Sequence, residues 1–270
     1  MRGGPAGGLP VRRLSSAAVL CAGVILLAGC AGAAGERIGA DGRGRSPTHT
    51  SSDVRGPDRD ARGDRGDRGD PGSRRDLPPV VNHVRTRDRV VFLTYDDGAE
   101  RDPRFVGLVR ERRLPVSMFL TDSVVGPGYG HFARLRAVGA SIQNHTLDHP
   151  ALRGLPYAGQ RAEICGQQHK LRSRFGIRPR LFRPPYGTYD TTTLRAAADC
   201  GIRAVVLWRV SLDSDGALTY PRGRPALRPG DIVSVPSGEP TSLSLTQRTL
   251  RLLREIEARG LRVARLEDYL

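Results

Sequence analysis

Two adjacent carboxylates, Asp96 and Asp97, follow an apolar run and precede Gly98. The run, V-V-F-L-T-Y over residues 90–95, consists of β-formers, which predicts a strand buried on both faces of a parallel sheet. Barrels and open α/β sheets place their chemistry at the carboxyl ends of such strands. Because neighbouring strand residues point to opposite sides, one carboxylate can hold a metal ion while the other acts as a base. A solvated Asp-Asp-Gly turn is the alternative for this stretch alone.

Two histidines, His145 and His149, stand four residues apart in N-H-T-L-D-H-P. On a helical turn this spacing places both imidazoles on one face, as a divalent metal requires. With one strand-end carboxylate they would form a two-histidine, one-carboxylate site with open positions for water, and zinc is the metal we expect there. Asp148, between the histidines, is expected to lie outside the ligand set. Two surface histidines are the alternative.

A third motif, R-P-P-Y-G, runs from Arg183 to Gly187 at the end of a predicted strand. An arginine beside two acids can fix one carboxylate by paired hydrogen bonds. The prolines stiffen the turn, and the backbone N–H of Tyr186 is available to a developing oxyanion. A structural Arg–Asp bridge is the simpler interpretation, and both can hold together.

In order and spacing, T-Y-D-D-G, H-T-L-D-H-P and R-P-P-Y-G resemble the first three motifs of the polysaccharide deacetylase (NodB-homology, carbohydrate esterase) family. The resemblance covers about residues 88–268. It implies a distorted (β/α)7 barrel that uses a divalent metal, often zinc, to remove N- or O-acetyl groups from carbohydrate polymers. The roles it implies are catalytic base for Asp96, metal ligand for Asp97, His145 and His149, orientation of the base for Arg183, and oxyanion donor through its N–H for Tyr186.

The second half of the chain departs from the family pattern. The fourth motif has a tryptophan followed three and six residues later by aspartates, whereas Trp208 is followed by Ser211 and Ser214. Asp213 and Asp215 are out of register. The sequence therefore lacks the aspartate that would support the catalytic acid.

The acid itself is also missing. The fifth motif is Leu-x-His, but the matching residues 234–236 read S-V-P, and no histidine follows His169. Pro236 carries no proton to give to a leaving amine. Metal binding is expected to be intact and catalysis to be reduced. Asp213, Asp215 and Glu239 are the candidates for a substitute acid.

Alternating strand and helix patterns predict a parallel sheet with right-handed crossovers. Strands are expected at residues 90–95, 116–121, 140–144, 181–183, 204–210, 231–235 and 262–266. Helices are expected at residues 103–112, 131–138, 157–175, 191–200 and 244–259.

The amino-terminal region has the features of a secretory signal. Arg12 and Arg13 precede a short apolar run that ends L-A-G-C at Cys30, too short for a spanning helix. The ending resembles the lipobox of bacterial lipoproteins, which implies that Cys30 carries lipid. An uncleaved membrane anchor is the alternative. We therefore predict a signal peptide over residues 1–30 and an extracellular, membrane-anchored protein.

A polar segment rich in Gly, Arg, Asp and Ser follows over residues 31–77, and it holds too few large apolar residues to form a core. It is predicted to be a disordered tether that joins the anchor to a catalytic domain over residues 78–270. Arg62 to Asp70 reads R-G-D three times. We interpret this as low-complexity drift in a soluble linker, with cell adhesion as the alternative.

The formal charge is +15, and Lys170 is the only lysine. Such arginine-rich usage is typical of biased coding. The basic body could favour anionic wall polymers or lipid head groups. Few aromatics and no basic-aromatic motif are present, so we expect no nucleic-acid partner.

Cys165 and Cys200 both fall in predicted helices. Outside the cell they can form a disulfide, with two buried thiols as the alternative.

These observations predict a lipid-anchored hydrolase, monomeric, that deacetylates an N- or O-acetylated glycan such as peptidoglycan or a chitin-like polymer. The first alternative is a metal-bearing pseudoenzyme that only binds wall polysaccharide. The second is a hydrolase for another amide or ester whose leaving group needs no strong acid.

Overall fold

The computed structural model describes residues 76–221, 225–236 and 243–270. Contacts within the chain divide it at Asp64, and every described residue lies in the unit 65–270. The predicted signal peptide, Cys30 and nearly all of the predicted tether lie outside the described residues. Among the described helices, none combines the length and apolar character needed to cross a membrane.

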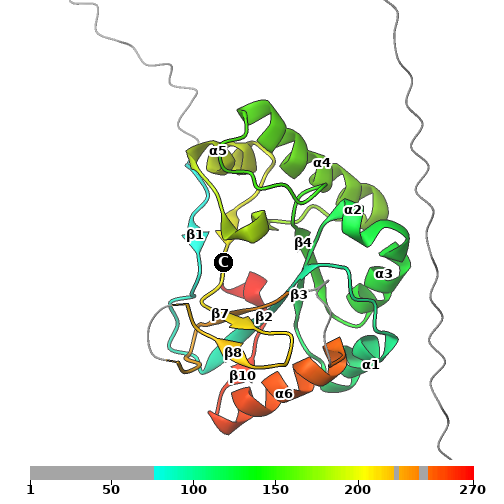
Figure 1. Cartoon of the computed structure of the whole chain (residues 1–270), viewed down its shortest axis with the longest axis vertical. Helices are drawn as coiled ribbons and strands as arrows, with labels where there is room; N and C mark the ends of the chain where they lie inside the picture. The colour runs from blue at the N-terminus through cyan, green and yellow to red at the C-terminus, as the bar shows by residue number, and fades with distance from the viewer. Residues whose placement is uncertain (1–75, 222–224, 237–242) are drawn as a thin grey trace, which may run out of the picture. The chain divides into compact units, whose positions relative to one another are not determined.

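One sheet of mostly parallel strands forms the centre of the fold (Figure 1). Its strands are β1 (Val80–Val81), β2 (Val90–Asp97), β3 (Ser117–Leu120), β4 (Ser141–Asn144), β5 (Leu181–Phe182), β6 (Ala204–Val206), β7 (Val210–Leu212), β8 (Leu218–Thr219), β9 (Ile232–Val235) and β10 (Arg262–Val263). The order is β1-β6-β5-β4-β3-β2-β9-β7-β8, with β10 beside β2. Only the β7–β8 pair is antiparallel among these neighbours.

Strands β6 and β7 lie far apart in this order, yet only residues 207–209 separate them in the chain. The sheet must therefore curl to bring the two strands close together. The sequence predicted one strand over 204–210, and this prediction was wrong in the middle. Leu207 N–H donates to Val81 O on β1, whereas Arg209 N–H donates to Ile232 O on β9. The backbone changes partners within three residues, so one strand becomes two. The curled parallel sheet is the distorted (β/α)7 barrel type that the motifs implied.

Helices cover the outside of the curled sheet in Figure 1. They are α1 (Pro103–Arg112), α2 (Asp122–Val125), α3 (Tyr129–Ala137), α4 (Tyr157–Phe175), α5 (Thr191–Asp199) and α6 (Leu245–Ala258). Short 3₁₀ turns occur at Gly126–Gly128, Pro185–Gly187 and Leu266–Asp268. Side-chain caps fix several helix starts: Ser244 and Gln247 form a reciprocal capping box at α6, as Asp190 and Thr193 do at α5.

Alternation along β2 separates two cores. Val91, Leu93 and Tyr95 pack in the cluster that includes helix residues such as Phe105, whereas Val90 and Phe92 pack in a second cluster inside the curled sheet. Asp96 has the same parity as Phe92. The strand therefore presents its first carboxylate on the inner side, at the carboxyl end of the sheet.

A disulfide joins Cys165 on α4 to Cys200 at the end of α5, as predicted for an oxidised pair. The bond closes a loop of sequence separation 35. By the chain-entropy estimate, such a loop contributes about 3–4 kcal/mol, because it restricts the unfolded chain.

We expect the Cys165→Ser/Cys200→Ser protein to lose about 3–4 kcal/mol of unfolding free energy. Guanidinium denaturation of oxidised wild type, reduced wild type and the double variant measures this loss. Reduced wild type should match the variant, because only the bond distinguishes it from the oxidised protein. A double variant as stable as the oxidised wild type would contradict this account.

Candidate active site

Asp96 is held on both oxygens. Arg183 Nη1 donates to its Oδ1 at 2.6 Å, and Ser234 Oγ donates to its Oδ2 at 2.6 Å. Ser234 lies on β9, where it pairs in register with Thr94 of β2, two residues before Asp96. All three polar groups are buried. The carboxylate is therefore fixed in orientation by two neighbours, Ser234 on β9 and Arg183 directly after β5.

Arg183 is fully buried between two aromatic rings, with its guanidinium 4.4 Å from the Phe119 ring centroid and 5.3 Å from that of Trp208. Its Nε donates to Val206 O at 3.1 Å. Burial lowers the pKa of Arg183, and the negative charge of Asp96 opposes this shift. The rings and carbonyl group hold the guanidinium in one geometry, so it can position a carboxylate.

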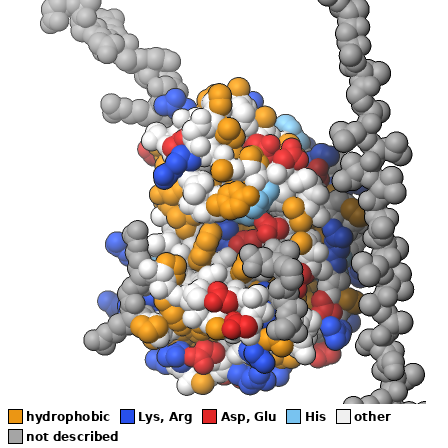
Figure 2. All heavy atoms as spheres, viewed as in Figure 1, with side chains coloured by type: hydrophobic (Ala, Val, Ile, Leu, Met, Phe, Trp, Pro, Cys, Tyr) orange, Lys and Arg blue, Asp and Glu red, His pale blue; other side chains and the backbone are white. Residues whose placement is uncertain are grey.

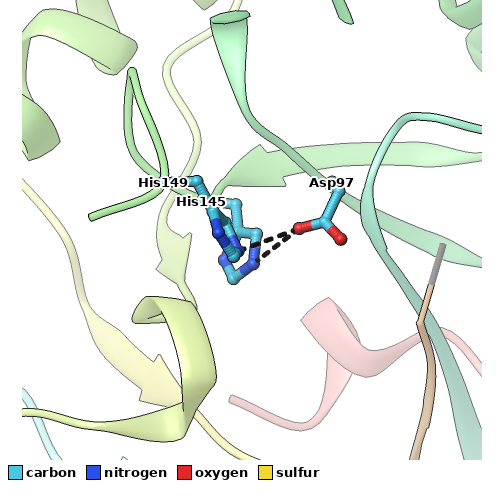
Figure 3. A group of neighbouring side chains, drawn as sticks. All are labelled: Asp97, His145 and His149. Atoms are coloured by element: carbon cyan, nitrogen blue, oxygen red, sulfur yellow. Dashed lines mark ion pairs between the residues drawn. The ribbon is translucent and has the colours of Figure 1, made fainter. Parts of the chain in front are cut away.

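Asp97 turns away from its neighbour through a left-handed backbone angle, φ +64°. Its Oδ1 lies 3.2 Å from His145 Nε2 and 3.1 Å from His149 Nε2 (Figure 3). Burial alone would raise the pKa of the Asp97 carboxyl, but N–H groups or positive charge on the two imidazoles would outweigh burial and hold that pKa well below its usual range.

The donor set suits a divalent cation. His145 Nδ1 donates to Arg183 O at 2.7 Å, so in the neutral ring Nε2 presents a lone pair to Asp97 Oδ1. That oxygen is buried and forms no hydrogen bond with a described group. Two acceptors face each other, an arrangement that a cation stabilises. Ligands about 2.0–2.2 Å from a tetrahedral zinc stand about 3.3–3.6 Å apart. The distances from Asp97 Oδ1 to the two Nε2 atoms, 3.2 and 3.1 Å, are close to this range.

The predicted helical turn for the two histidines was wrong, because residues 145–150 form an irregular loop. Thr146 and His149 have left-handed φ angles of +73° and +61°. Side chains bind the loop backbone in place of a helix: Asn144 Oδ1 accepts from Thr146 N–H at 3.0 Å, and Glu163 Oε2 accepts two further N–H groups, each at 3.0 Å. The imidazoles converge through loop geometry, with Glu163 supplied by α4.

Tyr186 lies in the 3₁₀ turn Pro185–Gly187 with φ +59°. Its backbone N–H donates to no group among the residues that the structure describes. Its side chain is 65% exposed, and the ring centroid lies 4.8 Å from that of His149. The N–H is thus available to a bound oxyanion, and the ring lies at the rim of the site.

These contacts link all six candidates into one cluster. It contains the metal-binding candidates Asp97, His145 and His149 together with the catalytic candidates Asp96, Arg183 and Tyr186. The catalytic roles stay predictions. In the space-filling view, a histidine and acidic side chains reach the surface near the middle of one face, beside hydrophobic side chains (Figure 2). Among the described residues, the His–His–Asp group is the only cluster suited to a metal ion.

Two of the candidates for a substitute acid, Asp213 and Asp215, do not join this cluster. Asp213 and Asp215 lie around the β7–β8 turn and bond within it: Thr219 Oγ1 donates to Asp213 at 3.3 Å, and Ala217 N–H donates to Asp215 at 2.9 Å. Glu239 lies outside the described residues. Pro236 is exposed at the end of β9.

Sequence reasoning missed Ser234 as a partner of Asp96, having treated it only as a departure from Leu-x-His. The signal was present: a hydroxyl on a buried strand, one residue before the strand end, has the parity of inward-facing positions. Glu163 had no such signal, because it reaches the histidine loop from a separate helix.

A curled parallel sheet with a candidate metal site at its carboxyl ends defines the class of protein. The family model for polysaccharide deacetylase matches residues 83–205. A chitooligosaccharide deacetylase from Bradyrhizobium is 30% identical over 168 residues, which cover 56% of this chain and 72% of the relative. The chain belongs to the polysaccharide deacetylase family, a family of hydrolases.

Other similarities agree with this assignment. A Streptomyces coelicolor protein, SCO4760, is 70% identical over 210 residues, which cover 78% of this chain and 84% of the relative. The chitin deacetylase of Colletotrichum lindemuthianum shares the fold, with TM-score 0.57 at 19% identity over 72% of this chain and 92% of that one. A CE4 family pseudoenzyme from Bacillus anthracis also shares it, with TM-score 0.60 at 19% identity over 71% and 69% of the two chains.

Proposed function

We propose that this protein is a zinc-dependent hydrolase that removes acetyl groups from an N- or O-acetylated carbohydrate polymer. The observation that carries the proposal is the juxtaposition of the Asp97, His145 and His149 group with the fixed carboxylate of Asp96. Relatives named chitooligosaccharide deacetylase and peptidoglycan-N-acetylglucosamine deacetylase support a glycan substrate.

Asp97, His145 and His149 would hold the zinc ion. A zinc ion bound there would polarise the acetyl carbonyl and bring the pKa of a water molecule to about 7. Asp96 would accept the proton of the attacking water. Arg183 and Ser234 hold that carboxylate in place, and the Tyr186 N–H would donate to the oxyanion of the tetrahedral intermediate. His145 is oriented by its bond to the Arg183 carbonyl.

The alternative is a metal-bearing protein that binds a wall polysaccharide without cleaving it. Pro236 favours this alternative, because a proline at the end of β9 cannot protonate a leaving amine. The fold is compatible with such a role, since the Bacillus anthracis neighbour is named a pseudoenzyme.

One assay separates the two candidates. Zinc-loaded full chain is incubated with acetylated chitin oligomers and with peptidoglycan, and both free acetate and glycan binding are measured. The hydrolase predicts acetate release that a chelator abolishes. Glycan binding without acetate release from N- or O-acetylated material would establish the alternative.

The proposal includes an anchor on the outer side of the bacterial membrane. Cleavage of a signal over residues 1–30 would leave lipidated Cys30 at the amino terminus, and residues 31–77 would tether the catalytic domain, residues 78–270. The support is the L-A-G-C ending after a basic start and a short apolar run.

We expect Cys30→Ala to move most of the protein out of the membrane fraction, because the acyl chains that would hold it there cannot be attached. Fractionation of producing cells followed by immunoblotting measures the shift. Cys21→Ala is the matched control, since it removes a cysteine from the same apolar run, leaves the L-A-G-C ending intact and should leave the distribution unchanged. A Cys30→Ala protein as firmly membrane-bound as wild type would contradict the lipid anchor.

A further inference from the structure

A second hollow lies at the end of the sheet opposite the candidate active site. Its lining includes Ser141, the first residue of β4, and Leu181, the first residue of β5. The metal-binding candidates follow the carboxyl ends of β2 and β4 instead. Because these strands are parallel, the hollow occupies the amino-terminal mouth. Its volume is about 480 Å³, within the range of small-molecule sites.

Four arginines line this hollow: Arg136, Arg178, Arg180 and Arg265. None of them forms an ion pair with an acid among the residues that the structure describes. Three of the four are exposed, and Arg265 donates to Gly139 O at 3.0 Å. Unpaired guanidinium groups around a concavity create a positive potential that attracts anions.

One acid, Glu267, lines the same hollow, but its Oε1 already serves the protein. It accepts from Ser117 Oγ at 3.0 Å, from Gln143 Nε2 at 2.8 Å and from Ser141 Oγ. Glu267 thereby joins the first residues of β3 and β4, and it forms no ion pair with the arginines. The side chains of the lining therefore keep a clear excess of positive charge.

An adjoining hollow of about 290 Å³ extends the positive surface over α4 and the end of α5. Arg161, Arg172 and Arg178 line it beside the Cys165–Cys200 disulfide. Arg178 belongs to both hollows, so they are neighbours. The one acid that lines this second hollow, Asp199, accepts from the Tyr157 hydroxyl at 2.6 Å. Together the two hollows carry six arginines against two acids; we call them the basic track.

We propose that the basic track binds an anionic polymer whose phosphodiester groups are joined by non-aromatic links. Guanidinium forks match phosphate oxygens in pairs. Two hollows that share one arginine suit successive charges of one chain better than a single small ion. The described linings contain no Phe, Tyr or Trp on which bases could stack, which disfavours single-stranded nucleic acid. Their concavity disfavours the flat surface of a membrane.

The placement has a functional consequence. The basic track and the candidate active site occupy opposite ends of the parallel strands, so one polymer can be held while another reaches Asp96. The inference does not depend on the deacetylase proposal, because its residues and its measurement are separate from the metal site.

The test uses a fluorescently labelled glycerol-phosphate oligomer and the purified full chain, with binding followed by anisotropy. We expect Arg136→Gln/Arg178→Gln/Arg180→Gln to weaken binding at least tenfold. The matched control is Arg85→Gln/Arg87→Gln/Arg110→Gln, which removes the same charge from exposed positions outside both linings. It should change affinity less than threefold. Circular dichroism checks that both variants fold.

Three results would overturn the proposal. If the two triple variants weakened oligomer binding equally, binding would depend on the overall positive charge of the protein and not on the basic track. Binding of single-stranded DNA as tight as binding of the oligomer would indicate a nucleic-acid surface. Binding of vesicles of anionic lipid that also depends on the three track arginines, without binding of the oligomer, would indicate a membrane surface.

Discussion

Removal of any one of Asp97, His145 and His149 is expected to weaken zinc binding more than about 100-fold. Changes to residues that merely support metal ligands already cost about 10–100-fold, and loss of a direct ligand removes a charge or a lone pair that nothing replaces. In this protein the three candidate ligand atoms lie within 4.8 Å of one another, so each would supply one of only three protein bonds to the ion. Zinc affinity is measured by competition with a chromophoric chelator, and zinc content by mass spectrometry.

Asp148→Ala is the matched control for the ligand variants. Asp148 stands between the two histidines, but its side chain is exposed and its backbone N–H, which donates to Glu163, survives the substitution. We expect its zinc affinity to equal that of wild type. If His145→Ala and Asp148→Ala retained zinc equally well, the assigned site would be wrong.

The second large effect concerns the missing acid. A positioned general acid contributes about 10²–10⁴-fold, or roughly 3–5 kcal/mol of barrier. Amide cleavage expels a poorer leaving group than ester cleavage, so its absence should reduce kcat mainly for N-acetyl groups. The metal site, Arg183 and the Tyr186 N–H should still support some turnover. We therefore expect weak N-deacetylation and a relative preference for O-acetyl substrates, measured as kcat on matched oligosaccharides.

Restoring the acid should raise amide turnover. Ser211 on β7 and Ser234 on β9 are paired in register, so an aspartate at 211 lies near the end of β9 that carries Pro236. Pro236 is exposed, and its carbonyl, which accepts from Arg248 Nη1 at 3.3 Å, is retained on substitution. Pro236→His with Ser211→Asp is thus expected to increase kcat for amides by about 10²-fold or more.

Pro236→Ala is the control for the restored acid, since it removes the ring and returns a backbone N–H without adding an acid. It should leave amide turnover at the wild-type level. Wild-type amide turnover near the common enzyme median of about 10 s⁻¹, with no gain in the folded double variant, would show that another residue already supplies the proton. Glu239 would then be tested before Asp213 and Asp215, which bond within the β7–β8 turn.

Local patterns predicted most of the fold. Helices α1 and α4 have the predicted bounds; α5 ends one residue early, and α6 is one residue shorter at each end. These helices were predictable because apolar spacing and capping residues are local features of the sequence. The short strands β1 and β8 and helix α2 were missed. The split between β6 and β7 was also missed, because it depends on which neighbours the backbone meets at Leu207 and Arg209.

The same division holds for the site. Strand parity and motif order anticipated that Asp96 and Asp97 would take different partners, Arg183 and the two histidines. The loop conformation that brings the two imidazoles together could not be predicted from their spacing in the sequence. Left-handed φ angles at Thr146 and His149 replace the expected helical turn. The support from Glu163 arises only when α4 packs beside the loop.

The most direct test of the central claim compares acetate release from acetylated chitin oligomers by wild type and Asp96→Asn, each shown to hold one equivalent of zinc. Asp96 is predicted to be a base rather than a ligand, so the variant should keep its metal. The account predicts slow, measurable acetate release by wild type and loss of that release in Asp96→Asn. Release by Asp96→Asn at the wild-type rate would contradict the account.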